Sequence, residues 1–379
     1  MEDRSLRSVL YVLPATAIGG AETRFRTIIR QTKEMRSVLL THSVVADYFS
    51  DLGIAVRLFD EYGCHSPMPF SFRETLRYAK AISAAVGREN IDCIFGIMHV
   101  GTFYSAVAKD LFRLRPPLIG TILGNISAYF DKEQREPTFL EKSLLWYLLR
   151  RPSLLAVPSE GVKNDIVKNF KLPEDRIRVI YNGVDIDNVR VMSSERADLL
   201  DGYEGKIILT ACRLNAQKDF PTLLNAFKEV RKTIESKLVI VGDGELREEI
   251  VRYAMDINIG KDLVITGFQK NPYKYMRRAD VFVLSSFFEG FGNVIVEAMA
   301  LDVPVVATDC PSGPAEIVQN GINGFLVPVQ NQHVMAERLL KLLTDEDIRR
   351  KIAEKGRLRA DSFAVEPMID KFRELILQS

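Results

Sequence analysis

The sequence has few of the features that mark a secreted, membrane-embedded or metal-binding protein. It has four cysteines in 379 residues, and none of them forms a CxxC pair: Cys64, Cys93, Cys212 and Cys310. This wide spacing excludes a disulfide framework or a cysteine zinc site and indicates free thiols in a reducing compartment. No apolar run is long enough to cross a bilayer, and the charged N-terminus shows no signal peptide, so we expect a cytoplasmic protein.

An excess of charge of one sign is also absent. The 51 basic and 50 acidic residues give a formal net charge of +1. Nucleic-acid-binding proteins usually carry a basic excess, so we expect no nucleic-acid partner. Two nucleotide-binding fingerprints are missing as well, because the sequence contains neither GxGxxG nor a Walker A motif. NAD-dependent and ATP-hydrolysing functions therefore lack their motifs.

What the sequence does contain is a regular alternation of short apolar runs and amphipathic segments. Predicted strands lie at residues 9–13, 38–41, 56–59, 93–97, 118–123, 154–157 and 179–181, and then at 207–211, 238–241, 263–266, 281–284 and 303–307. Predicted helices lie between them, for example at 21–33, 72–88, 138–150, 221–232, 246–255, 293–301 and 334–343. This alternation predicts an α/β protein with two Rossmann-like, doubly wound parallel-sheet domains that face a cleft.

The predicted division between the domains is the segment 185–204. It has no clean periodicity and is rich in Asp, Ser, Glu and Arg. One Rossmann-like domain then spans residues 1–184 and the other spans residues 205–360. Ligands of open parallel sheets bind where loops leave the carboxyl ends of the strands, so these loops are the expected place for chemistry.

Two of these loops suit an anionic ligand. Gly19 and Gly20 follow the first strand and open a helix, where a ligand can come close to the backbone and meet free N–H groups. Arg213 and Lys218 follow the strand at 207–211, and such a pair of cations suits a diphosphate. Taken alone, the glycines also fit a tight turn, and the cations also fit a solvated surface pair.

A third loop and the helix after it combine glycines with two carboxylates. In chain order this segment contains Glu289, Gly290, Gly292, Asn293 and Glu297. Asn293 is a predicted helix N-cap, and the carboxylates can bind sugar or ribose hydroxyls. Glu297 alone would also fit as a partner of the helix macrodipole. A fourth loop, at 309–316, fits either a phosphate- or sugar-binding loop or a plain strand-to-helix turn.

Together these motifs resemble those of the family-4 retaining glycosyltransferases, also called glycosyl transferases group 1. The Glu-x7-Glu motif in EGFGNVIVEAMA, which begins at Glu289, is the mark of that family. Further matching motifs keep the family's order: GGAE at 19–22, SEGV at 159–162, IYNGVD at 180–185, RLNAQKDF at 213–220, GDGELR at 242–247 and GFQKNP at 267–272. The resemblance covers nearly the whole chain. It implies the GT-B arrangement, with a C-terminal helix at 361–379 that returns to the first domain.

The resemblance also implies a binding site for a nucleotide-sugar donor, mainly in the second domain. It assigns Arg213 and Lys218 to the diphosphate, Glu297 to the ribose hydroxyls and Glu289 to the donor sugar. Glu289, Lys218 and Arg213 are the expected catalytic residues. Backbone groups near the sugar and phosphate are expected from Gly290, Phe291, Gly292, Asn293 and Val294. The other expected donor-binding positions are Gly19, Gly20, Gly242 and Phe268, the last of which lies where the family's chain passes the base.

On the acceptor side the sequence departs from the family. Many members carry a His after the fifth strand of the first domain, but the segment 121–125 has none. His99, after the preceding strand, is one candidate for a polar role in the acceptor pocket, although a lone His is more often structural. Asn125 is a second candidate, and Ser127 and Arg135 are weaker ones.

One motif is a false lead towards a metal. Asp185 and Asp187 read as DxD, the metal-binding motif of the other large glycosyltransferase fold. They follow Asn182 and Gly183, however, where Asp is ordinary turn chemistry. Because two cations already supply the charge that a metal would bring, we expect no metal site and no cofactor other than the nucleotide-sugar co-substrate.

The implied function is retaining, metal-independent hexosyl transfer, with a UDP-hexose or a UDP-N-acetylhexosamine as the expected donor. The expected acceptor is a glycan or a lipid-linked saccharide, in the synthesis of cell-surface polysaccharide, lipopolysaccharide or another glycoconjugate. A GDP-mannose-dependent mannosyltransferase is the main alternative. A nucleotide-sugar epimerase would not be expected to carry the Glu-x7-Glu motif, and a noncatalytic sugar-nucleotide-binding protein would be expected to have a broken donor site.

One segment raises the question of peripheral contact with the inner face of the cytoplasmic membrane. Residues 142–151, KSLLWYLLRR, place Trp146 and several leucines beside basic side chains. Arg113 and Arg115 add charge nearby in the sequence, as is typical of an interfacial surface. The segment is nearly apolar all round, however, and a buried core helix is the preferred interpretation.

Overall fold

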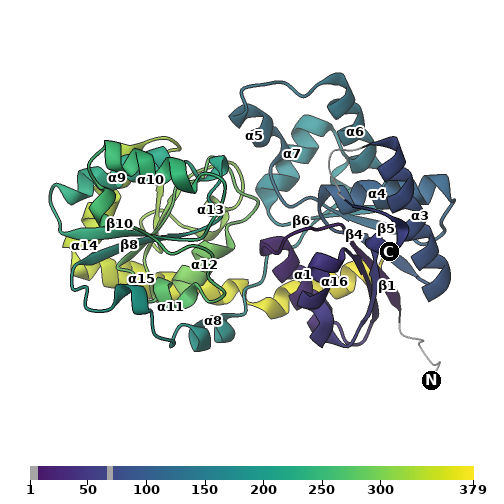
Figure 1. Ribbon diagram of the computed structural model, residues 1–379, viewed down its shortest axis with the longest axis horizontal. Coiled ribbons are helices and arrows are strands. Elements are labelled where there is room, and N and C mark those ends of the chain that lie inside the picture. Colours follow the sequence, from purple (N-terminus) through teal and green to yellow (C-terminus); the bar gives the residue numbers. More distant parts are fainter. Residues whose placement is uncertain (1–6, 66–70) are drawn as a thin grey trace. The chain divides into compact units, whose positions relative to one another are not determined.

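The computed structural model describes residues 7–65 and 71–379, which form two compact units. Unit 1 comprises the described residues up to Leu123 together with Arg135–Tyr181 and Glu366–Ser379. Unit 2 comprises Gly124–Gln134 and Asn182–Val365. Each unit is built on one parallel sheet with helices packed around it (Figure 1). Strands in such a sheet are apolar on both faces and are buried only when helices cover both.

The sheet of unit 1 has seven strands in the order β3-β2-β1-β4-β5-β6-β7. All neighbouring strands pair in parallel. The strands are β1 (Ser8–Leu13), β2 (Arg36–Thr41), β3 (Ala55–Leu58), β4 (Cys93–Gly96), β5 (Leu118–Thr121), β6 (Leu154–Val157) and β7 (Ile177–Val179). Every residue of the inner strand β1 is buried, as expected for a parallel strand covered on both faces.

The helices of unit 1 include the last helix of the chain. They are α1 (Gly20–Gln31), α2 (Ser43–Ala46), α3 (Phe72–Glu89), α4 (Met98–Leu111), α6 (Phe139–Arg150), α7 (Glu160–Phe170) and α16 (Val365–Leu377), with 3-10 turns η1 (Asp47–Leu52), η2 (Phe59–Tyr62) and η3 (Glu174–Arg176). Figure 1 shows α16, in yellow, beside α1. Phe372 of α16 packs against Phe25 of α1 and Phe95 of β4. The C-terminal helix therefore completes the hydrophobic core of unit 1.

The sheet of unit 2 has six parallel strands in the order β10-β9-β8-β11-β12-β13. The strands are β8 (Lys206–Ala211), β9 (Ser236–Val241), β10 (Leu263–Ile265), β11 (Val281–Leu284), β12 (Val305–Thr308) and β13 (Phe325–Val327). One hydrophobic core joins the sheet to the helices on one of its faces, and its fully buried members include Ile208, Phe227, Val283 and Leu339.

The helices of unit 2 lie before, between and after its strands, except for the first, which lies between β5 and β6 of unit 1 in the sequence. They are α5 (Ile126–Lys132), α8 (Ile186–Met192), α9 (Phe220–Arg231), α10 (Arg247–Asp256), α11 (Tyr273–Met276), α12 (Asn293–Ala300), α13 (Pro314–Ile317), α14 (Gln332–Thr344) and α15 (Glu346–Ala360). The 3-10 turns are η4 (Asp198–Leu200), η5 (Ala216–Lys218), η6 (Gly260–Asp262) and η7 (Asp361–Phe363). In the described chain, no helix has the length and apolar character needed to cross a membrane.

The structure confirms the predicted α/β class with two parallel-sheet units, and all four cysteines are free thiols. Three details differ from the predictions. The last strand of unit 1 was predicted at 179–181 but lies at Ile177–Val179. The strand β13 was missed, because its apolar run of three residues is too short to be recognised. The segment 185–204 is not irregular throughout, since it contains the helix α8.

The predicted N-cap of α12 is also wrong by one position. Gly292 is the N-cap, with φ of 101°, and Asn293 is the first helical residue. The backbone at the cap lies in the left-handed region, which glycine adopts without steric cost. The Asn293 side chain is thereby left available for another contact.

Candidate functional site

The loops after β8 and β11 lie side by side, because these two strands are neighbours in the sheet of unit 2. Gln217 joins the two loops by two hydrogen bonds. Its side-chain Nε2 donates to the backbone carbonyl of Phe288 (2.7 Å), and its backbone carbonyl accepts from the Phe287 amide (2.8 Å). Ser285 Oγ also donates to the Lys218 carbonyl at 2.5 Å. These bonds hold both loops at the carboxyl edge of the sheet, where parallel α/β sheets bind their ligands.

Lys218 and Glu289, one from each loop, form an ion pair. Lys218 Nζ lies 2.5 Å from Glu289 Oε1, and the two side chains are only 14% and 11% exposed. Ser286 Oγ donates to the same carboxylate oxygen at 2.6 Å. Burial alone would lower the pKa of Lys218, but the Glu289 carboxylate reverses this and raises it. The lysine therefore stays charged, and Glu289 Oε2, to which no described residue donates, is left for a ligand.

The N-terminus of α12 lies directly after Glu289. The amides of Asn293 and Val294 are in the first turn and donate to no carbonyl among the described residues. Gly313 packs against this loop with φ of 88°, and a Cβ there would lie 2.2 Å from the Phe291 carbonyl oxygen. The loop after β12 therefore supports the loop after β11 from behind. Free amides at a helix N-terminus form a binding site for an anion such as phosphate.

Glu297 lies one turn further along α12, in a different environment. Burial raises the pKa of its carboxyl group to about 7. The described residues offer it neither an ion pair nor a side-chain hydrogen bond. An ionised carboxylate without a partner is disfavoured in such surroundings. Its oxygens are therefore free to accept hydrogen bonds from the hydroxyl groups of a ligand.

Two further polar residues belong to this site and were not assigned to it from the sequence. One is Ser286, which holds Glu289. The other is Asn182, whose Nδ2 donates to Asn293 Oδ1 at 2.8 Å and whose buried Oδ1 accepts no hydrogen bond from the part of the chain that the structure describes. Asn182 lies in the IYNGVD motif, so its sequence signal was visible. Its contact with a residue 111 positions away was not, because only the tertiary fold brings the two together.

Three other expected donor-site residues lie on loops at the same edge of the unit 2 sheet. Gly242 has φ of 148°, and a Cβ there would lie 1.9 Å from the Cys212 carbonyl oxygen. This glycine lets the loops after β8 and β9 approach each other. Phe268, after β10, is 70% exposed. Arg213 is also exposed, and within the described residues it has no ion pair. Both side chains are open to a ligand.

In unit 1 the expected donor residues lie at the start of α1. Gly19 is the N-cap, and its amide donates to Glu22 Oε2 at 2.8 Å. A Cβ at Gly20 would meet no atom within 4 Å, so packing within the protein does not require a glycine there. His99 is the second residue of α4 and is exposed, while desolvation by the surrounding protein lowers the pKa of its imidazole. The ring is therefore neutral at pH 7.

The other acceptor-side candidates are engaged within the protein. Asn125 Oδ1 caps α5 by accepting from the Ala128 amide, and its Nδ2 donates to Ser312 Oγ, both at 2.9 Å. Arg135 forms an ion pair with Glu141 at 2.8 Å. These contacts give each side chain a structural role, and a role in acceptor binding stays a prediction for both residues and for Ser127.

The two aspartates of the DxD sequence have separate structural environments. Asp185 caps α8, with its Oδ1 accepting from the Asn188 amide at 3.0 Å. Asp187 is 96% exposed and lies 3.9 Å from Arg190. Within the described ranges, no three His, Cys, Asp or Glu side chains gather closely enough to hold a metal ion.

The protein therefore consists of two α/β units, each with a parallel sheet. One unit brings cations, helix N-terminal amides and two carboxylates together at the carboxyl edge of its sheet. A family model named "Glycosyl transferases group 1" matches residues 192–359, and a model named "Glycosyltransferase Family 4" matches residues 18–188. The chain belongs to the family-4 glycosyltransferases of the GT-B fold.

Similar proteins agree with this assignment. A Campylobacter jejuni protein named N-acetylgalactosamine-N,N'-diacetylbacillosaminyl-diphospho-undecaprenol 4-alpha-N-acetylgalactosaminyltransferase is 32% identical over 226 residues, 60% of each chain. A lipopolysaccharide core biosynthesis glycosyltransferase of Rhizobium meliloti is 30% identical over 201 residues, 53% of this chain and 57% of the relative. The matches thus span under two thirds of either relative. The structure of Anabaena HepE in complex with UDP and glucose has a TM-score of 0.83 at 21% identity, covering 98% of this chain and 100% of HepE.

Proposed function

We propose that this protein is a retaining glycosyltransferase that transfers a hexose or an N-acetylhexosamine from a UDP-sugar. The acceptor is a glycan or a lipid-linked saccharide, in the synthesis of cell-surface polysaccharide, lipopolysaccharide or another glycoconjugate. The observation that carries the proposal is the combination of the Lys218–Glu289 pair with the free amides at the start of α12. The names of the relatives support the acceptor class, and the UDP complex of HepE supports the donor.

In the proposed reaction the bond between the sugar and the diphosphate breaks while the acceptor hydroxyl attacks from the same face of the sugar. Lys218, Arg213 and the first-turn amides of α12 stabilise the negative charge that grows on the leaving diphosphate. A diphosphate oxygen accepts the proton of the acceptor hydroxyl. Glu289 Oε2 accepts hydrogen bonds from the donor sugar and orients it, and Glu297 accepts them from the ribose hydroxyls.

We propose further that transfer needs no metal ion, because the cations and amides already supply positive charge to the diphosphate. The test is the rate of transfer in excess EDTA. The expected result is an unchanged rate. A loss of transfer that added Mg²⁺ or Mn²⁺ restores would contradict the proposal.

A donor and acceptor screen read by mass spectrometry tests the reaction itself. We expect release of UDP together with a product heavier by one hexose or N-acetylhexosamine. Thermal denaturation with UDP and with GDP separates the two donor classes, and UDP is expected to raise Tm more. Stabilisation by GDP alone would instead support the mannosyltransferase. Conversion of a UDP-sugar to its epimer without UDP release would support an epimerase, and binding without turnover would support a noncatalytic protein.

We also propose that unit 1 makes a peripheral contact with an anionic membrane through the helix α6. It is not a buried core helix, because only Leu148 and Leu149 are buried. Phe139 and Trp146 are 88% and 57% exposed. They lie on one face of the helix, seven residues apart. The Arg150 guanidinium lies 4.9 Å from the centre of the Trp146 ring. Exposed aromatic side chains beside cations are typical of helices that lie in a membrane interface.

Flotation with phosphatidylglycerol vesicles at low salt tests the membrane contact. The wild-type protein should float with the vesicles, and the double variant Phe139→Ser/Trp146→Ser should not. Phe72→Ser is the matched control, because Phe72 is 86% exposed at the start of α3 and is not part of this face. Equal flotation of all three proteins, or no flotation of the wild type, would contradict the proposal.

A further inference from the structure

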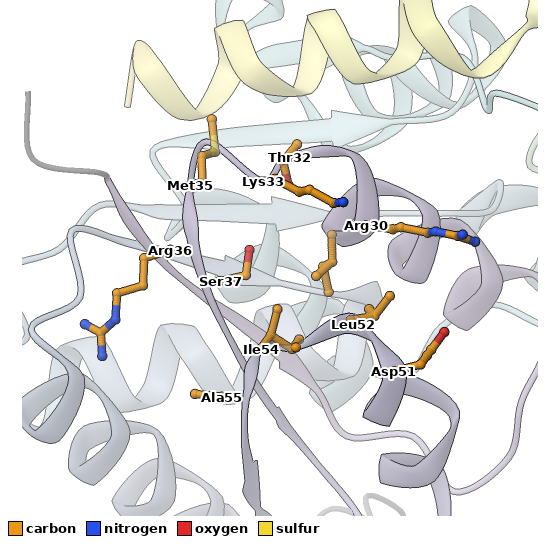
Figure 2. A pocket seen from close by; sticks show the side chains of 12 residues that line it. Arg30, Thr32, Lys33, Met35, Arg36, Ser37, Asp51, Leu52, Ile54 and Ala55 are labelled. Atoms are coloured by element: carbon orange, nitrogen blue, oxygen red, sulfur yellow. The ribbon is translucent and has the colours of Figure 1, made fainter.

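Unit 1 has a cavity of about 520 Å³ at the amino ends of β2 and β3 (Figure 2). Its cations Arg30 and Lys33 are exposed at the end of α1, and its buried Thr32 hydroxyl already donates to the Ile28 carbonyl at 2.9 Å. In unit 2, by contrast, the candidate site has a largely buried cation, Lys218, beside helix amides that meet no carbonyl of the described chain. Such groups depend on their surroundings for a fixed position.

The first turn of α12 begins without a side-chain cap. Three other helices of unit 2, α9, α14 and α15, are capped by the side chains of Asp219, Asn331 and Asp345. A capping side chain accepts a hydrogen bond from an amide of the first turn. The cap of α12 is Gly292, which has no side chain to do this. The amides of Asn293 and Val294 therefore stay free for an anion, but the helix start lacks the restraint that a capping bond would give.

Asn182 holds this helix start without occupying its amides. Its Nδ2 donates to Asn293 Oδ1 at 2.8 Å, so the contact uses the side chain of Asn293 and not its backbone. The bond is partly buried, and a hydrogen bond is stronger where the surrounding protein excludes water. Asn182 is the residue at which unit 2 resumes after Tyr181 of unit 1. The bond therefore restrains the residue that carries the first free amide.

The loop before α12 has a second anchor on a neighbouring segment. The ring of Phe291 packs edge-on against that of Phe363, with the ring centres 5.3 Å apart, and both side chains are buried. The Phe363 carbonyl in turn accepts from the amide of Val184 at 2.9 Å, two residues after Asn182. The two anchors thus lie on adjoining segments, which pair at a parallel β-bridge. Together they hold the loop and the start of the helix.

We infer that Asn182 is a positioning residue for the donor diphosphate, and this inference rests on the proposed function. Through the side chain of Asn293, Asn182 fixes the direction of the two free amides of α12, so that both meet the same diphosphate. Asn182 acts through Asn293 and does not itself bind the donor. Donors that are held in place stabilise developing charge well, because they need no reorganisation during the reaction. A site whose supporting contacts are loose loses much of this effect.

Calorimetric binding of UDP and of uridine tests this role, because uridine has no diphosphate to meet the amides. Asn182→Ala should raise the Kd of UDP about 2- to 10-fold, the value of one ordinary hydrogen bond, and leave the Kd of uridine unchanged. Asn293→Ala breaks the same bond from its other end and should act alike, so the result does not depend on the folding of one variant.

Asn225→Ala is the matched control. Asn225 is half-buried like Asn182, and its Nδ2 donates to the Tyr253 hydroxyl, also at 2.8 Å. This bond joins α9 to α10 and does not involve the loop after β11. Asn182→Ala and Asn225→Ala should lower Tm by similar amounts, because each removes a bond of the same kind and length. Only Asn182→Ala should weaken UDP binding or slow turnover.

A double-mutant cycle tests whether Asn182 acts through Asn293. With the donor and acceptor that the mass-spectrometry screen selects, each single Ala variant should lower kcat, and the double variant should be no slower than the slower single one. The inference is overturned if Asn182→Ala weakens UDP and uridine alike, if it acts no more strongly than Asn225→Ala, or if the two losses in kcat multiply. A wild type that binds UDP but transfers no sugar would instead overturn the proposed function, and the comparison of UDP with uridine would still decide the positioning role.

Discussion

Glu289 and Glu297 lie eight residues apart in one loop and helix, yet unit 2 gives them opposite environments. Glu289 is paired with Lys218 and accepts a second bond from Ser286. Glu297 has no such partner among the described residues, and burial raises the pKa of its carboxyl to about 7. Both carboxylates belong to the Glu-x7-Glu motif, so the motif marks the positions but not the chemical state of either side chain.

This difference indicates two separate tasks. The Glu289 carboxylate raises the pKa of Lys218, so the lysine keeps its charge at neutral pH, and the pair connects the loops after β8 and β11. It suits a step in which negative charge develops on the diphosphate. The lone carboxyl of Glu297 suits hydroxyl groups whose contacts change little during the reaction. Substitutions on the two sides should therefore affect different kinetic constants.

Lys218→Ala should have the largest effect. We expect kcat to fall about 100- to 1,000-fold, because a stabiliser of charge in the transition state is lost. UDP affinity should fall less, by about 10-fold. The measurements are steady-state kinetics and calorimetric UDP binding. Lys232→Ala, which breaks an exposed ion pair with Glu229, is the control and should change neither.

The same variant leaves the Glu289 carboxylate largely buried without its cation, and this can cost about 3–5 kcal/mol of stability. Thermal denaturation should therefore show a lower Tm. Lys218→Ala/Glu289→Gln removes the unpaired charge and should regain part of the Tm but none of the activity. If activity returned with stability, Lys218 would have only a structural role.

Glu289→Gln should have the next largest effect, on turnover. We expect kcat to fall about 10- to 200-fold, the value of one charge-assisted hydrogen bond to the sugar. UDP affinity should stay near that of the wild type, because UDP lacks the sugar. Near wild-type kcat in a variant that binds UDP normally would remove Glu289 from the reaction.

Glu297→Ala should mainly weaken UDP binding, by about 10- to 100-fold, with a smaller change in kcat at saturating donor. The measurement is the Kd of UDP compared with that of 2′-deoxy-UDP. The wild type should discriminate between the two ligands, and the variant should not. Undiminished discrimination would show that another group binds the ribose.

The smallest expected effect is on the pH dependence of protein stability. Because the native Glu297 carboxyl keeps its proton up to pH about 7, against an ordinary pKa of 4.5, its ionisation favours the unfolded state. Its contribution to stability is full below pH about 4.5 and is lost as pH rises through about 7. The loss is at most about 3 kcal/mol, by the value of one pKa unit. Glu297→Gln should therefore raise Tm relative to the wild type more at pH 8 than at pH 5.

UDP binding gives the matching test, since only the ionised carboxylate accepts hydrogen bonds from both ribose hydroxyls. Wild-type UDP affinity should fall as pH drops from 8 to 6, and Glu297→Gln should flatten this dependence. An equal slope in both proteins would assign the titration to another group.

Much of the fold followed from local patterns. The strands at 154–157 and 281–284 were predicted with the bounds that the structure has. The short strand β13 and the Gly292 cap were not, because three apolar residues give no periodic signal and a cap depends on the backbone conformation of one residue. Among the site residues, the sequence pointed to Lys218 and Glu289 but not to their contact.

By itself, then, the sequence determined the alternation of strands and helices, the order of the family's motifs and the identity of the charged groups, since these depend on local composition and spacing. The tertiary structure alone decided the ion pair of Lys218 with Glu289 and the bond of Asn182 to Asn293. It also exposed Phe139 and Trp146 on a helix that composition had favoured as buried. Each of these depends on which distant segments exclude water from a side chain, and no local pattern carries that information.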